Sequence, residues 1–134
     1  MNYWLVKSEP HKYSWQQLLK DGSTFWDGVR NYAARNHMRN MKPGDLVLFY
    51  HSNEGKDVVG MAKVIKEAYQ DPTTDDDRWS AVDIAPVETL KKPVTLAQIK
   101  ADNRLQNMWL VRQGRLSVMP VTREEFDTIL ELSE

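Results

Sequence analysis

The segment MKPGDLVLFYHSN, residues 41–53, contains a helix end, a turn, a buried strand and a polar strand end in direct succession. Lys42-Pro43-Gly44-Asp45 is typical of a turn that stops a helix. Leu46 to Tyr50 is a short continuous apolar run, which indicates a strand that is covered on both faces. We therefore expect a central strand whose polar end, His51-Ser52-Asn53, faces a cleft.

Four further runs have the composition of strands. Gly60 interrupts one of them, which suggests a bulge or a close approach of another part of the molecule to the backbone. Pro86 interrupts another and implies an edge position or a strand end, because proline cannot donate a ladder hydrogen bond. The four expected strands are Tyr3 to Lys7, Val58 to Tyr69, Trp79 to Val87 and Leu116 to Val121.

Helix starts are indicated by three capping-box patterns, in which a Ser or Thr is followed three residues later by Gln or Glu. They are Ser14-Trp15-Gln16-Gln17, Thr95-Leu96-Ala97-Gln98 and Thr122-Arg123-Glu124-Glu125. A fourth helix is expected over Arg30 to Asn40, with one apolar stripe toward the core and one basic stripe beside it. The apolar stripe is Ala34, Met38 and Met41, and the basic stripe is Arg35, Arg39 and Lys42.

The resulting order of elements is β-α-α-β-β-β-α-β-α, without the regular alternation of a doubly wound fold. This order favours an α/β (α+β) protein whose mixed or antiparallel sheet curls into an open barrel with helices packed outside. The length of 134 residues, with no internal repeat or linker, predicts a single domain over residues 1–134.

The composition excludes several kinds of chemistry. With no cysteine, the chain has no disulfide, thiolate nucleophile or cysteine-ligated metal. The histidines His11, His37 and His51 lack paired ligand spacing, so no metal is expected. No glycine-rich phosphate loop or nucleophile elbow is present, and we expect neither a cofactor nor catalysis. An enzyme acting on nucleic acid or nucleotides, with Glu9, Asp27 or His51 as its acid or base, is the alternative.

No apolar run reaches the roughly 18 residues that a transmembrane helix needs, and residues 1–4 do not begin a signal peptide. We therefore expect no membrane contact and a cytoplasmic location. The oligomeric state is left open.

The net charge is −1, but the bases are unevenly distributed. Residues 28–44 contain four bases and no acid, and residues 91–115 contain six bases with Asp102 as the one acid. If the two segments lie together they form a basic face; otherwise these are scattered solvated charges.

Four blocks of sequence resemble the EVE family in order and spacing. They are YWLVKSEP at 3–10, WDGVRNY at 26–32, MKPGD at 41–45 leading into FYHSN at 49–53, and RLSVMPV at 115–121. The family has a PUA-like fold and is similar to YTH domains, which hold methylated adenine in an aromatic cage. The resemblance implies a pocket for one modified base, a 5-modified cytosine in DNA, with modified RNA as the other partner to consider.

The residues agree with such a pocket. A base must leave its stack before it is enclosed, and stacking on an aromatic face returns about 1–3 kcal/mol per base. Trp26, beside Gly28, is the expected face, and Tyr50 and Trp79 are possible further walls. The expected base-binding residues are Lys7, Ser8, Glu9, Trp26, Val29, Asn31, Tyr50, His51, Ser52 and Ser117, and the expected phosphate-binding residues are Arg30, Arg35, Arg39, Lys42 and Arg115.

Structural roles compete with several of these assignments. Arg30 could form a salt bridge with Asp27 that fixes the loop, and Asp45 is expected to tie the turn after Gly44. Trp4, Trp15 and Trp109 are expected to pack in or against the core. A protein-interaction module attached to RNA-processing machinery is a further alternative, whose sign would be an exposed apolar patch.

Overall fold

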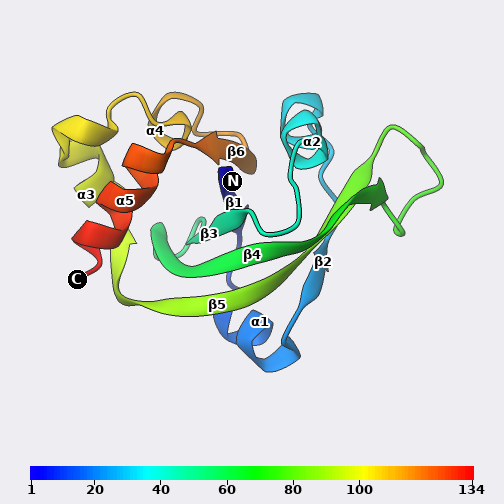
Figure 1. Ribbon diagram of the computed structural model, residues 1–134, viewed down its shortest axis with the longest axis horizontal. Coiled ribbons are helices and arrows are strands. Elements are labelled where there is room, and N and C mark those ends of the chain that lie inside the picture. The colour runs from blue at the N-terminus through cyan, green and yellow to red at the C-terminus, as the bar shows by residue number, and fades with distance from the viewer.

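The computed structural model describes residues 1–134 as one six-stranded sheet with helices packed around it (Figure 1). No helix is long and apolar enough to cross a membrane. The strands are β1 (Tyr3–Ser8), β2 (Thr24–Trp26), β3 (Leu46–His51), β4 (Asp57–Gln70), β5 (Ser80–Thr95) and β6 (Val118–Val121). The helices are α1 (Trp15–Asp21), α2 (Tyr32–Arg39), α3 (Leu96–Ala101), α4 (Trp109–Arg112) and α5 (Arg123–Leu132), with a 3-10 turn at Asn103–Leu105.

The sheet has the strand order β2-β5-β4-β3-β1-β6. Only β1 and β3 are parallel neighbours, with Tyr3 opposite Leu46 and Ser8 opposite His51, and all other pairs are antiparallel. The α+β class and the mixed sheet expected from the sequence are confirmed. The outer strands β2 and β6 do not pair with each other, so the curved sheet stays open rather than closing into a barrel.

The expected strands all occur, but their bounds and neighbours differ from the sequence pattern. Strand β5 continues past Pro86 to Thr95. Its partner β2 pairs only with Val82–Ile84, so at Pro86 the strand has β4 as its single neighbour. The edge position that Pro86 implied is therefore confirmed. The short elements β2 and α4 and the 3-10 turn were not expected.

Local capping explains where the helices begin. Thr95 and Thr122 both form the complete reciprocal capping box. Ser14 accepts from the Gln17 N–H, without the reciprocal bond from the glutamine side chain. Helix α2 begins later than expected, because the Asn31 side chain accepts from the Ala34 N–H and so caps it.

Asp45 ties the turn before β3 to the first strand, as the sequence indicated. Its carboxylate is buried and accepts hydrogen bonds from Trp4 Nε1 at 2.9 Å, the Lys42 N–H at 3.0 Å and the Asn2 N–H at 3.1 Å. A buried charge is costly unless its acceptor positions are used. The carboxylate therefore fixes the end of α2 against β1.

Trp15 joins α1 to the sheet. The side chain is 1% exposed, and its Nε1 donates to Thr89 Oγ1 at 2.8 Å. The indole lies directly over Gly60, where a Cβ would come within 2.3 Å of Trp15 Cε2. The close approach expected at Gly60 is thus confirmed, and the register of β3 and β4 shifts at the same place.

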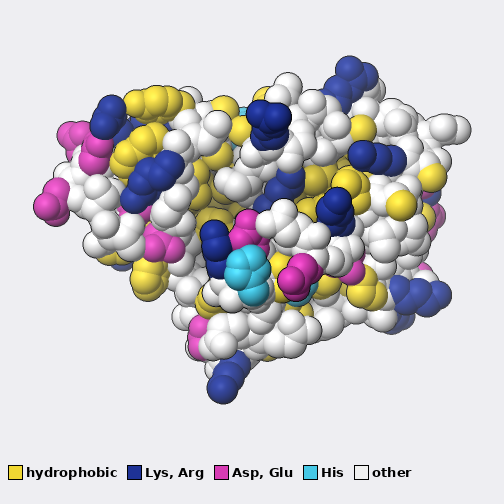
Figure 2. All heavy atoms as spheres, turned by 180° about the vertical axis from the view of Figure 1, so that it is seen from behind, with side chains coloured by type: hydrophobic (Ala, Val, Ile, Leu, Met, Phe, Trp, Pro, Cys, Tyr) yellow, Lys and Arg dark blue, Asp and Glu magenta, His cyan; other side chains and the backbone are white.

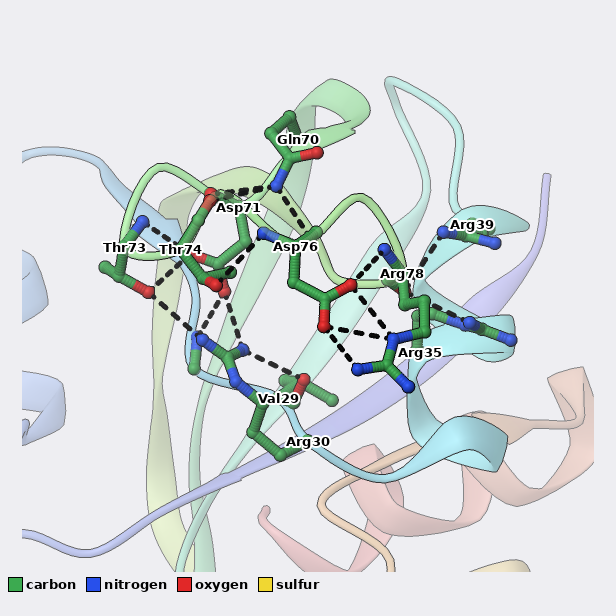
Figure 3. A network of polar contacts seen from close by, with 11 residues as sticks. Val29, Arg30, Arg35, Arg39, Gln70, Asp71, Thr73, Thr74, Asp76 and Arg78 are labelled. Carbon is green, nitrogen blue, oxygen red and sulfur yellow. Dashed lines mark hydrogen bonds and ion pairs between the residues drawn. The ribbon is translucent and has the colours of Figure 1, made fainter.

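Asp71 anchors the loop after β4 to the segment after β2 (Figure 3). The residue is fully buried, and one carboxylate oxygen accepts from the Gly28 N–H and from Arg30 Nη1, both at 2.9 Å. The other oxygen accepts from the N–H and the hydroxyl of Thr73. Burial acts to raise the pKa of Asp71, but these hydrogen bonds outweigh it and lower the pKa to about 2.

We expect Gly60→Ala to lower the free energy of unfolding by about 1–3 kcal/mol, because the new methyl group overlaps a rigid, fully packed indole. Urea denaturation followed by tryptophan fluorescence measures the change. Gly114→Ala is the matched control, because a Cβ there meets nothing closer than the Leu110 carbonyl at 3.9 Å. Equal stability of the two variants would contradict the packing of Trp15 on Gly60.

The low pKa of Asp71 makes stability depend on pH in a defined window. The folded-state pKa of about 2 lies below the ordinary value of 3.8, so the charged group stabilises the folded state above about pH 4. This contribution, about 2 kcal/mol, is lost as the pH falls toward 2. Asp71→Asn should therefore be less stable than wild type at pH 7. A stability difference that does not narrow between pH 6 and pH 2 would show that the charge is not the cause.

Candidate functional site

Four segments that are distant in the sequence converge on one open cleft of about 790 Å³. Its size lies within the usual range of ligand pockets. The walls come from the end of β1 with the turn after it, from β2 with the loop after it, from the end of β3, and from the segment before β6. The lining residues are Lys7, Ser8, Glu9, Lys12, Tyr13, Thr24, Phe25, Trp26, Asp27, Gly28, Val29, Arg30, Ser52, Gly114, Arg115, Leu116 and Ser117.

The parallel pairing of β1 and β3 brings their polar ends to the same edge of the sheet. The Ser52 N–H donates to the Ser8 carbonyl at 2.9 Å, which extends the pairing one residue past the end of β3. Asn53 Nδ2 donates to Glu9 Oε1 at 2.6 Å. The expectation that the polar strand ends face a cleft is therefore confirmed for Ser8, Glu9 and Ser52.

Lys7 connects this edge with the segment before β6. Its backbone N–H donates to the Ser117 carbonyl at 2.9 Å, and its Nζ donates to the Gly114 carbonyl. Burial lowers the pKa of the Lys7 ammonium. The ammonium also lies 5.7 Å from the centroid of the Tyr50 ring. Lys7 is thus a partly desolvated cation that holds the 114–117 segment in place.

Trp26 lines the cleft but also belongs to the hydrophobic core, so it is less open than the sequence suggested. The side chain is 9% exposed and packs edge-on against Phe49, with ring centroids 5.5 Å apart, and against Tyr13, with centroids 6.3 Å apart. Tyr13 and Phe25 also line the cleft, and the Phe25 ring is 48% exposed. We call Trp26 the aromatic floor of the cleft, and Tyr13 and Phe25 are the other aromatic residues of its lining.

The cations that line the cleft differ in whether an acid of the protein already pairs with them. Arg30 pairs with Asp71 rather than with Asp27, so the expected partner was wrong although the structural role was foreseen. Lys12 lies 3.3 Å from Glu9 Oε2. Arg115 makes no hydrogen bond and no ion pair, and it is exposed at the rim. It is the cation most available to a phosphate.

The structure places three expected base-binding residues outside the lining of the cleft. Asn31 is used as the cap of α2. Tyr50 is buried in the core with only 3% of its surface exposed. His51 Nε2 accepts from the Trp15 N–H at 3.0 Å, and burial lowers the pKa of this histidine against the opposing effect of Asp57. Its neutral ring therefore supports the start of α1.

The basic stripe of α2 also lies away from the cleft. Arg35 and Arg39 both donate to the Arg78 carbonyl (Figure 3). Lys42 pairs with Glu67. Of the expected phosphate-binding residues, only Arg30 and Arg115 line the cleft. Helix α3 and the C-terminus lie at the opposite end of the molecule from the loop after β4 (Figure 1).

The two basic segments meet only in part: Arg30 and Arg115 line the same cleft, whereas Arg35, Arg39 and Lys42 lie outside it. On the face seen in Figure 2, lysine and arginine side chains are dispersed and acidic side chains lie among them. Of the ten bases in these two segments, four form ion pairs within the protein: Arg30, Lys42, Lys91 and Arg104.

Several polar groups of the cleft are unused within the protein and can bind a ligand. The Ser52 and Ser117 hydroxyls and the Asp27 carboxylate line the cleft and make no hydrogen bond there, whereas the Ser8 hydroxyl donates to the Tyr13 carbonyl. Sequence reasoning missed Lys12, Tyr13 and Thr24, which gave no signal because only the three-dimensional packing brings them to the cleft. The cleft thus combines an aromatic floor, neutral polar groups, one unpaired acid and cations at the rim.

Comparisons of this chain with known proteins, by sequence and by structure, agree with one another. A family model described as the EVE domain matches residues 2–132. Thymocyte nuclear protein 1 of Mus musculus is 40% identical over 99% of this chain and 74% of its own length. A crystal structure of a protein from Agrobacterium tumefaciens is 48% identical, with a TM-score of 0.98 over 99% of this chain and 93% of that one.

Two further structures inform the fold and the site. Human THYN1 in complex with DNA that contains 5-methylcytosine is 38% identical, with a TM-score of 0.93 over 100% of this chain and 98% of that one. An ASCH protein from Zymomonas mobilis, 14% identical with a TM-score of 0.62 over 98% of this chain and 95% of that one, is similar in fold alone. The PUA-like fold expected from the sequence is confirmed. With a family match over nearly all of its residues and relatives of this similarity, the chain belongs to the EVE domain family.

Proposed function

We propose that this protein binds DNA that contains a 5-modified cytosine and holds the modified base, flipped out of the duplex, in the cleft above Trp26. The observation that carries the proposal is the human relative in complex with 5-methylcytosine DNA, which aligns with the whole of this chain. The cleft of this chain supplies what such a base requires.

The energetics of base capture support the aromatic floor as the main source of affinity. Flipping a base costs a few kcal/mol, and stacking on an aromatic side chain returns about 1–3 kcal/mol. In this proposal Trp26, Tyr13 and Phe25, which all line the cleft, contact the base by stacking or by their ring edges. The Ser52 and Ser117 hydroxyls are available to the polar edge of the base. Rim cations then position the flanking phosphates without reading sequence.

We propose a binding module rather than an enzyme. None of the three histidines lines the cleft, and His51 is engaged with the backbone of α1. Glu9 is held by Asn53 and Lys12, which leaves Asp27 as the one free titratable acid. A base-removing or nucleotide-hydrolysing activity would require a positioned acid–base group. Incubation with modified oligonucleotides for hours, without product, is the result we expect.

The central test compares a duplex with one 5-methylcytosine and the same duplex with cytosine, by fluorescence anisotropy. Wild type should prefer the modified duplex. Trp26→Phe, which keeps an aromatic ring in the core position, should bind the modified duplex about tenfold more weakly because less ring area is available for stacking. Trp26→Ala is less informative, because it would cost about 3–5 kcal/mol of core packing.

Trp109→Phe is the matched control, because Trp109 is 39% exposed and lies outside the cleft. Its affinities should equal those of wild type. Equal binding of modified and unmodified duplexes by wild type would overturn the proposed function. Unchanged binding by Trp26→Phe would remove the indole from the mechanism.

Arg115→Ala should weaken binding to modified and unmodified duplexes by the same factor, because the unpaired cation contacts phosphate and not the base. The slope of log affinity against log salt concentration should fall in magnitude by about one. Arg123→Ala, an exposed arginine paired with Asp127, serves as the control and should leave the slope unchanged. A change in the preference for the modified base would place Arg115 in base recognition instead.

A further inference from the structure

A cleft that reads 5-methylcytosine faces a second discrimination problem, because thymine has a similar ring and carries the same methyl group. The two bases differ at position 4, where cytosine has an amino donor and thymine has a carbonyl acceptor. Neither the aromatic floor at Trp26 nor an apolar contact with the methyl group distinguishes them. The bases also differ at N3, which accepts in cytosine and carries a donor hydrogen in thymine. Discrimination at position 4 requires a protein group that accepts a hydrogen bond and cannot donate one.

The side-chain hydroxyls of the cleft do not meet this requirement. A serine hydroxyl both donates and accepts, so Ser52 and Ser117 can satisfy an amino group or a carbonyl group equally well. An ionised carboxylate only accepts. The cleft contains two carboxylates, those of Glu9 and Asp27.

Only one of these carboxylates has no hydrogen bond and no ion pair within the protein. Glu9 Oε1 accepts from Asn53 Nδ2 at 2.6 Å, and Glu9 Oε2 lies 3.3 Å from Lys12 Nζ and 3.4 Å from His11 Nε2. Asp27 makes no hydrogen bond and no ion pair, although it is half-buried and its neighbour Arg30 is close in the sequence. Arg30 is directed to Asp71 instead, at 2.9 Å.

The backbone around Asp27 is fixed on both sides. Trp26 precedes it in β2, paired with Val82 of β5. Gly28 follows it with a φ of +72°, a conformation that side chains disfavour, and donates its N–H to the buried Asp71. An unpaired acid on a rigid loop beside the aromatic floor is a pre-organised acceptor. In a cleft that binds DNA it also opposes the phosphates, which argues against a role in general affinity.

We infer that Asp27 is the residue that selects cytosine over thymine, by accepting a hydrogen bond from the exocyclic amino group of the 5-modified base. The inference rests on the proposed function, because it assigns one edge of the base held above Trp26. Carboxylate acceptance from the cytosine amino group is a recognised mode of base readout. The methyl group and the amino group are then read by different parts of the cleft.

The test uses three duplexes in which the target base, opposite an abasic site, is 5-methylcytosine, cytosine or thymine. The abasic partner removes the difference in base-pairing energy, so the affinities compare the target bases alone. Wild type should bind 5-methylcytosine about tenfold more tightly than thymine. Asp27→Asn should bind both within about threefold, because its amide group donates as well as accepts. Its affinity for the thymine duplex should rise.

Two variants control for charge and for the rival acceptor. Asp75→Asn removes one exposed, unpaired acid outside the cleft and should leave the ratio between 5-methylcytosine and thymine unchanged. Glu9→Gln tests the second carboxylate. Loss of discrimination in Glu9→Gln but not in Asp27→Asn would overturn the inference, as would full discrimination in Asp27→Asn.

The outcomes separate this inference from the proposed function. Wild type that does not distinguish 5-methylcytosine from cytosine contradicts the proposed function itself. Wild type that makes this distinction, with Asp27→Asn equally selective against thymine, contradicts only the role of Asp27. Thermal unfolding of each variant confirms that the compared proteins are folded, and a rise in thymine affinity is not a result of structural damage.

Discussion

The buried carboxylate of Asp71 fixes the wall of the cleft that carries Trp26. It accepts hydrogen bonds from the Gly28 N–H and from Arg30, and so joins the loop after β4 to the loop after β2. A buried charge of this kind is tolerable only when donors surround it, and Thr73 completes the set. The arrangement uses the Arg30 charge within the fold. It therefore leaves Arg30 without a free charge for a ligand and leaves Asp27 without a basic partner.

Much of the fold follows from local sequence signals. The apolar runs of β1 and β3 and the capping boxes at Thr95 and Thr122 were predicted because their information lies within a few neighbouring residues. Strand β2 was missed because three residues, Thr24–Trp26, are too few to show a periodicity. Its existence depends on pairing with Val82–Ile84, a contact that no local pattern encodes.

Site residues at the ends of strands could be predicted from the sequence. Residues whose side chains bind distant parts of the chain could not. Ser8 and Ser52 were identified because each stands at the polar end of an apolar run, and the parallel pairing of β1 and β3 brings both to the same edge. Arg35 and Arg39 have the spacing of a phosphate-binding stripe, yet both donate to the carbonyl of a residue about 40 positions away in the chain. Tyr50 follows the strand pattern but belongs to the interior. A spacing rule reveals which residues share a helix face, and not what that face already contacts.

The bond from Lys7 Nζ to the Gly114 carbonyl spans 107 positions of the chain. On a ribosome, the first wall of the cleft emerges long before the segment that completes it. Until that segment has been made, β1 lacks its partner strand β6 and Lys7 lacks its bond to Gly114. Contacts of such long range slow folding. The cleft is therefore complete only after the segment that contains Gly114 has been made and has packed against β1.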